Sequence, residues 1–155
     1  VLDVGSGCGK FCLVGALTTE GEFHGVEQRP GLVQLAKDIA SEFEVKRAEY
    51  IQGDIRSIDW NQFDGFYLYN PFIENIYPDN IRMDESVEYS ERSYVELIRW
   101  VQRKLDALPV GARVVTYHGF GGDMPPGYSM RFFAPVGGDF LRLWVKEQRQ
   151  KPTVG

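Results

Sequence analysis

Cysteine and histidine are scarce in this chain of 155 residues, which has only two of each. Cys8 and Cys12 stand four positions apart, and no second cluster of cysteines or histidines completes a zinc site or a disulfide framework. We therefore expect no metal ion, and we expect both cysteines to be small buried thiols.

Long apolar runs are missing as well. No stretch approaches the roughly 18 apolar residues of a membrane helix, so we expect a cytoplasmic protein without a membrane partner. The length and the 43% hydrophobic content suit a single domain over residues 1–155. The chain opens without Met on the apolar run 1–4, so we expect that domain to lack an N-terminal segment that covers part of the ligand.

Positive charge is in the minority, with 17 Lys and Arg against 22 Asp and Glu and a formal net charge of -5. The basic residues are scattered except in the tail 146–151. A protein that binds extended DNA or RNA needs a basic face, so this balance argues against such a partner.

Apolar strands alternate with amphipathic helices, which predicts an α/β fold with a doubly wound, mainly parallel sheet. The second helix has Pro30 near its start, and Ser93 with Glu96 resembles a capping box for the third. Two further β-rich runs around a Gly-Gly turn predict an antiparallel hairpin at the end. The expected strands cover 1–4, 23–26, 48–52, 63–69, 113–117, 130–135 and 140–146, and the expected helices cover 10–17, 30–43 and 93–105.

A glycine-rich turn, 3–9, joins the first strand to the first helix. Such turns let a ligand approach the backbone, and the helix offers free N–H groups. The dinucleotide fingerprint needs glycine where Lys10 stands, and the phosphate-binding loop needs other residues at Val4 and Phe11. The pattern therefore disfavours a nicotinamide enzyme and a P-loop protein.

Three carboxylates stand where strands end. Asp3 at the mouth of the turn would attract an ammonium group, although it could instead bond the turn's own amides. Glu27 follows Gly9 by 18 positions, where a carboxylate accepts both hydroxyls of a ribose; a solvated strand end is the alternative. Asp54 follows the third strand and could accept from an adenine amino group, although Gly-Asp is also an ordinary turn.

The fourth strand ends in Tyr-Asn-Pro-Phe, beside the expected ligand crevice. Asn70 offers an amide oxygen, Pro71 holds the backbone extended, and Phe72 supplies a flat wall. Together they could align an amino group with a methyl donor, or they could form a simple turn. His118 follows the fifth strand near the same crevice and is a candidate substrate contact, whereas we expect His24 to be structural.

The motifs D-V-G-S-G-C-G, G-V-E, G-D-I, Y-N-P-F and L-P-V-G-A-R occur in the order typical of class I methyltransferases that use S-adenosylmethionine (SAM), and nearly the whole chain resembles that family. The resemblance implies a seven-stranded sheet whose last strand is antiparallel. It also implies a SAM site in which Gly5, Ser6, Gly7 and Gly9 surround the methionine moiety, Glu27 holds the ribose, Gln28 and Ile55 flank the adenine, and Asp54 binds its amino group. Apart from the resemblance, we expect Asp3 and Asn70 to contact the cofactor as well.

The 70–72 loop is similar to the N-P-P-[YF] loop of enzymes that methylate amide or ring amino nitrogens, but it lacks the second proline. It also resembles the loop of the non-SET histone lysine methyltransferases, whose basic substrate-facing regions are not evident. We hypothesise a methyltransferase in which Asn70, Pro71 and Phe72 position the acceptor and the segment 73–89 forms a lid. The alternatives are a SAM- or nucleotide-binding regulatory domain without turnover and an NAD-dependent oxidoreductase.

Overall fold

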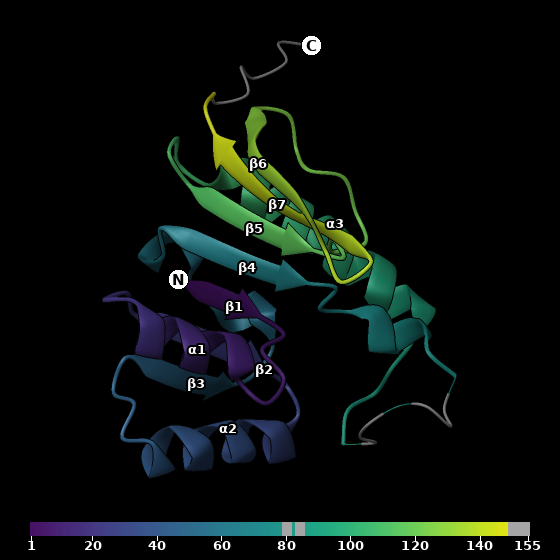
Figure 1. The fold of residues 1–155 in the computed structure, drawn as a ribbon. Helices are drawn as coiled ribbons and strands as arrows, with labels where there is room; N and C mark the ends of the chain where they lie inside the picture. The colour runs from purple at the N-terminus through teal and green to yellow at the C-terminus, as the bar shows by residue number, and fades with distance from the viewer. Residues whose placement is uncertain (79–81, 83–85, 149–155) are drawn as a thin grey trace.

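A single seven-stranded sheet forms the centre of the computed structural model, which describes residues 1–78, 82 and 86–148. The strand order is β3-β2-β1-β4-β5-β7-β6 (Figure 1). The first five strands are parallel, and β7 pairs antiparallel with both β5 and β6. This confirms the predicted fold class. The strands are β1 (Leu2–Val4), β2 (Phe23–Glu27), β3 (Ala48–Gln52), β4 (Gly65–Tyr69), β5 (Arg113–Tyr117), β6 (Tyr128–Val136) and β7 (Asp139–Lys146).

The α-helices cover both faces of the sheet (Figure 1). They are α1 (Lys10–Thr18), α2 (Pro30–Glu42) and α3 (Glu91–Ala107), and three short 3₁₀ turns, η1 (Ile55–Ser57), η2 (Trp60–Gln62) and η3 (Ile73–Ile76), follow β3 and β4. Pro30 opens α2, where its missing N–H costs no hydrogen bond.

The start of α3 differs from the prediction that Ser93 caps it. The cap is Ser90, whose backbone is extended and whose hydroxyl accepts a hydrogen bond from the backbone N–H of Ser93 at 3.1 Å. Ser93 lies inside the first turn, where its own N–H is one of the donors that needs a cap. The capping assignment was therefore wrong by three residues.

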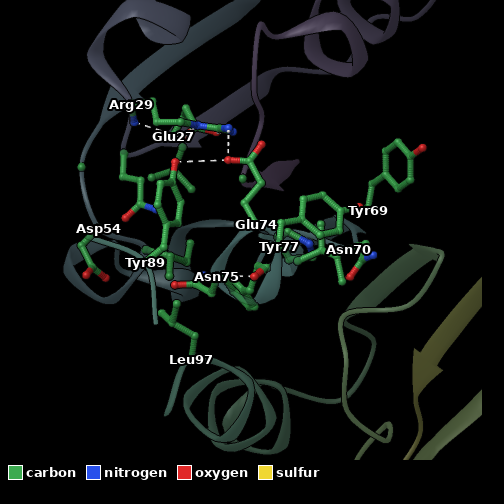
Figure 2. Close-up of a pocket in the computed structure, with 18 of the residues that line it drawn as sticks. Glu27, Arg29, Asp54, Tyr69, Asn70, Glu74, Asn75, Tyr77, Tyr89 and Leu97 are labelled. Atoms are coloured by element: carbon green, nitrogen blue, oxygen red, sulfur yellow. Dashed lines mark hydrogen bonds and ion pairs between the residues drawn. The ribbon is translucent and has the colours of Figure 1, made fainter. Parts of the chain in front are cut away.

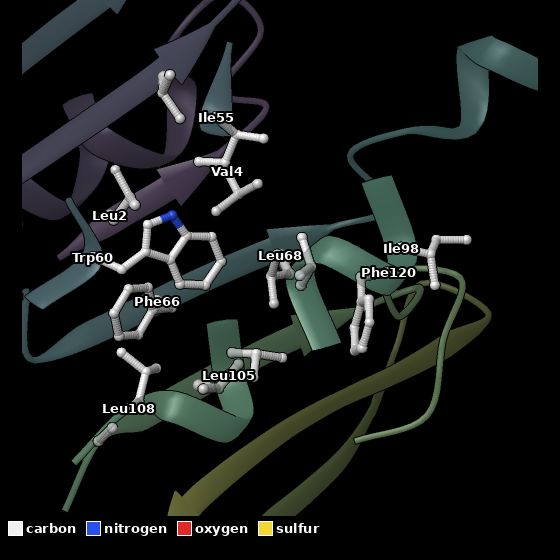
Figure 3. Packing of buried hydrophobic residues seen from close by; sticks show 14 of the residues in the cluster. Leu2, Val4, Ile55, Trp60, Phe66, Leu68, Ile98, Leu105, Leu108 and Phe120 are labelled. Atoms are coloured by element: carbon white, nitrogen blue, oxygen red, sulfur yellow. The ribbon is translucent and has the colours of Figure 1, made fainter. Parts of the chain in front are cut away.

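Two apolar clusters pack on the two faces of the sheet. Trp60 and Phe66 stack at a ring-centroid distance of 4.9 Å and join the α3 residues Val101 and Leu105 in the larger cluster (Figure 3). The smaller cluster lies under α1 and α2 and contains the fully buried Cys12. Cys8 is partly exposed, and both thiols are free. With both faces covered, the ligand site is left to the edge where the parallel strands end.

The described part of the chain contains neither a membrane-spanning helix nor a metal-binding cluster. No helix there is both long and apolar enough to cross a membrane. In the same residues, no group of three or more His, Cys, Asp or Glu side chains is arranged to hold a metal ion.

Candidate functional site

A cavity of about 480 Å³ opens at the carboxyl ends of β1, β2, β3 and β4 (Figure 2). This volume lies in the range of pockets that bind small molecules and cofactors. Eight predicted site residues line it: Gly5, Glu27, Gln28, Asp54, Ile55, Asn70, Pro71 and Phe72. Asp3, Ser6, Gly7 and Gly9 are not among the described residues that line it.

The glycine turn has a left-handed backbone at three positions, with φ of 73° at Gly5, 55° at Gly7 and 78° at Gly9. A Cβ on Gly5 would lie 2.9 Å from the Cβ of Pro71, and one on Gly9 would lie 2.3 Å from the ring of Tyr50. Both positions therefore exclude a side chain for steric reasons as well as by conformation. A Cβ on Gly7 would meet no atom within 4 Å, so this part of the turn faces open space.

Asp3 lies beneath the turn, with only 4% of its surface exposed. The thiol of Cys12 donates to its carboxylate at 3.7 Å, and burial raises the pKa of Asp3 to about 7. This carboxylate is thus packed against α1 rather than aimed into the cavity. Its predicted role toward an ammonium group stays a prediction.

Glu27 ends β2 and is 3% exposed. Its two carboxylate oxygens accept hydrogen bonds from the Gly7 N–H at 3.0 Å, from the Arg29 N–H at 3.0 Å and from the Arg29 guanidinium at 2.8 and 2.9 Å. Burial alone would raise the pKa of Glu27, but the bonds to Arg29 outweigh it and the pKa is lowered. Glu27 is therefore an ionised acceptor at the cavity wall.

Arg29 links this wall to the loop after β4. Its guanidinium donates to Glu74 at 2.6 Å, and the hydroxyl of Tyr89 donates to the same Glu74 oxygen at 3.2 Å (Figure 2). Sequence reasoning missed all three residues. Arg29 stands two residues after Glu27, immediately before α2, and this short spacing between opposite charges was a usable signal. Glu74 and Tyr89 fall in the predicted lid 73–89, of which residues 79–81 and 83–85 lie outside the described part.

Asp54 caps η1 rather than standing free. Its carboxylate accepts from the Arg56 N–H at 2.8 Å and pairs with the Arg56 guanidinium, and these bonds lower the pKa of Asp54. Ile55 is buried beside it, whereas Gln28 is exposed on the facing loop. The structure thus provides an apolar surface next to an ionised carboxylate.

The loop after β4 closes the other end of the cavity, where Figure 2 shows Tyr69 and Asn70 on the side away from Arg29. Asn70 has a φ of 43°, and its N–H donates to the carbonyl of Gly119 at 2.9 Å. His118, at the end of β5, has a φ of 55° and also lines the cavity. These are two of the three non-glycine residues with a left-handed backbone in the described chain, and such strain gathers at functional sites.

A family profile described as a methyltransferase domain matches residues 1–73. That segment holds the glycine turn, Glu27, Asp54 and the Asn70 loop. No curated protein is similar enough in sequence to match the chain.

Solved structures resemble the whole chain at low sequence identity. An RNA methyltransferase from Salinibacter ruber in complex with S-adenosyl-L-homocysteine matches with a TM-score of 0.67 and 22% identity, over 99% of this chain and 84% of that one. A mutant of MtNAS in complex with S-adenosylmethionine matches with a TM-score of 0.61 and 16% identity, over 95% of this chain and 54% of that one. An O-methyltransferase from neocarzinostatin biosynthesis matches with a TM-score of 0.62 and 14% identity, over 93% of this chain and 48% of that one. The chain spans about half the length of the last two, and these likenesses establish a shared fold.

Proposed function

We propose that this chain, a class I methyltransferase domain, transfers a methyl group from SAM to an amino or amide nitrogen of a protein or a small molecule. One observation carries the proposal. The ends of β1, β2, β3 and β4 bring Gly5, Glu27, Asp54 and Asn70 to a single cavity of about 480 Å³. We place the reaction in the cytoplasm.

The cavity suits the chemical groups of SAM along its length. The carboxylate of Glu27 would accept the two ribose hydroxyls, sharing its oxygens with Arg29. Ile55 and Gln28 would flank the adenine, with Asp54 at its amino group. The turn leaves room for the methionine moiety at Gly7, because a Cβ there would meet no atom within 4 Å. Bound SAM would supply an activated methyl group on a sulfonium.

The Asn70 loop would hold the acceptor beside that methyl group. The backbone N–H of Asn70 donates to the carbonyl of Gly119, which fixes the loop. The loop lies against the glycine turn, because a Cβ on Gly5 would lie 3.2 Å from the carbonyl oxygen of Pro71. An amide oxygen and a backbone carbonyl can both accept hydrogen bonds from an amino group. Methyl transfer is a direct displacement, so alignment of this kind can contribute roughly 7 to 11 kcal/mol.

Two measurements test the proposal against its alternatives. Titration calorimetry with SAM, S-adenosylhomocysteine and NAD⁺ should give binding of the first two only; preferential binding of NAD⁺ would favour an oxidoreductase. Labelled-methyl SAM is then offered with protein, RNA and small-molecule fractions, and label should enter protein or small molecules. SAM binding without any transfer would favour a regulatory domain, and label confined to RNA would overturn the proposed acceptor class.

A further inference from the structure

The end of β5 is fastened to the β6–β7 hairpin beside the cavity. The Nδ1 atom of His118 lies 2.6 Å from a carboxylate oxygen of Asp139, the first residue of β7. The other oxygen of Asp139 accepts from the Phe140 N–H at 2.6 Å. In parallel, the Tyr117 hydroxyl donates to the carbonyl of Val136 at 2.9 Å. The carboxylate is therefore held at both oxygens and faces His118 in a fixed position.

This pairing determines which nitrogen of His118 is free. An ionised carboxylate only accepts hydrogen bonds, so Nδ1 carries the hydrogen, and in the neutral ring Nε2 is then the nitrogen that keeps the lone pair. The ring is also held by its neighbours, since it lies 5.3 Å from the Tyr69 ring at 25° and 4.3 Å from the Tyr117 ring. His118 and Asn70 line the same cavity, and the next residue, Gly119, accepts from the Asn70 N–H.

We infer that His118 is the general base of the methyl transfer and that Asp139 is its positioning residue. The inference rests on the proposed function. The acceptor nitrogen uses its lone pair to form the N–CH₃ bond, while the S–CH₃ bond breaks and its electron pair stays on sulfur. The proton lost by the nitrogen goes to Nε2 of His118, and the carboxylate of Asp139 stabilises the imidazolium that results.

Among the residues that the structure describes, Asp139 is the charged group in contact with His118. From β7 the group that faces it is Asp139, and from β4 and β5 the titratable groups are the phenols of Tyr69 and Tyr117. Glu74 lies on the same cavity but is bonded to Arg29. A pair that only attached the hairpin to β5 would not require a left-handed backbone at His118, beside the left-handed backbone of Asn70 at the same cavity.

The rate test uses His118→Gln, which keeps a polar side chain of similar length but takes up no proton near neutral pH, and Asp139→Asn. We expect His118→Gln to lower kcat by about 10² to 10⁴-fold and to abolish the acidic limb of its pH profile. Asp139→Asn should lower kcat by at least about 10-fold, because an amide can donate to Nδ1 and favour the wrong tautomer. Both should bind SAM within about twofold of wild type. Asp38→Asn, on the exposed side of α2, is the matched control.

A second readout needs neither SAM nor an acceptor. The chain has only His24 and His118, so ¹⁵N spectra of the imidazoles contain two sets of signals that His118→Gln assigns. We expect the Nδ1–H tautomer of His118 in the wild type and its loss in Asp139→Asn. An Nε2–H tautomer in the wild type, or an unchanged kcat profile in His118→Gln while methyl transfer is measured, would overturn the base and leave the proposed function intact. Absence of SAM binding by the wild type would overturn both.

Discussion

Glu27→Ala removes the acceptor at the centre of the proposed ribose site. Its carboxylate now holds one N–H of the glycine turn and three donors of Arg29, at 2.8 to 3.0 Å. Hydrogen bonds to a charged group are worth about 1.5 to 3 kcal/mol. The loss of the ribose contacts should therefore raise the Kd for SAM about 10- to 150-fold.

The same substitution should also destabilise the protein, because Glu27 and Arg29 are 3% and 11% exposed. Removing one partner of a buried ion pair costs about 3 to 5 kcal/mol, and we expect about 3 kcal/mol because Arg29 keeps its bond to Glu74. Glu27→Ala with Arg29→Ala should recover part of this loss, since no buried cation is then left without its partner. The fold should survive in both, given the stability of ordinary domains.

Titration calorimetry gives the Kd, and urea unfolding gives the free energy of unfolding of each variant. Glu49→Ala on the neighbouring strand β3 is the control, because Glu49 is exposed and lies outside the cavity. If folded Glu27→Ala binds SAM with wild-type affinity, Glu27 does not hold the cofactor. If the double variant is no more stable than the single one, the ion-pair reasoning is wrong.

Three further predictions concern other parts of the site. Asn70→Gly, which tolerates the φ of 43°, should lower kcat far more than it weakens SAM binding; an equal loss of both would make Asn70 a cofactor contact. Gly9→Ala should lower the free energy of unfolding by about 2 kcal/mol or more, because the added methyl group would clash with Tyr50. Gly31→Ala in α2, where the added methyl group meets open space, should raise the free energy of unfolding by about 0.5 to 1 kcal/mol. Equal urea midpoints of the two variants would contradict this prediction. Burial raises the pKa of folded Asp3 to about 7, so the wild type should lose stability as pH rises from about 4 to 7 and this carboxyl ionises. Asp3→Asn should therefore be more stable than wild type at pH 8 and show no such gain at pH 4. Parallel curves of stability against pH for the two proteins would refute this prediction.

Much of the fold could be predicted from the sequence because its signals are local. The predicted bounds of β3 and β5 equal the observed ones, since each is a short run of strand-forming residues bounded by turns. The glycine turn and the Asn70 loop were placed correctly at the ends of β1 and β4, because parallel strands end at one edge. The cap of α3 was misplaced, since Ser90 and Ser93 both fit the residue preference and only the backbone distinguishes them.

The partners of the site residues were decided by the tertiary structure alone. Arg29 meets Glu74, 45 residues away, because the loops after β2 and β4 end at the same cavity. His118 meets Asp139 because β7 pairs antiparallel with β5 in the register that sets Tyr117 opposite Leu141. A strand pattern specifies which residues share a face, but a slip of the register would move every such pair. The sequence by itself therefore determined the elements and the edge where the ligand lies, and the packing of the strands decided which charges meet there.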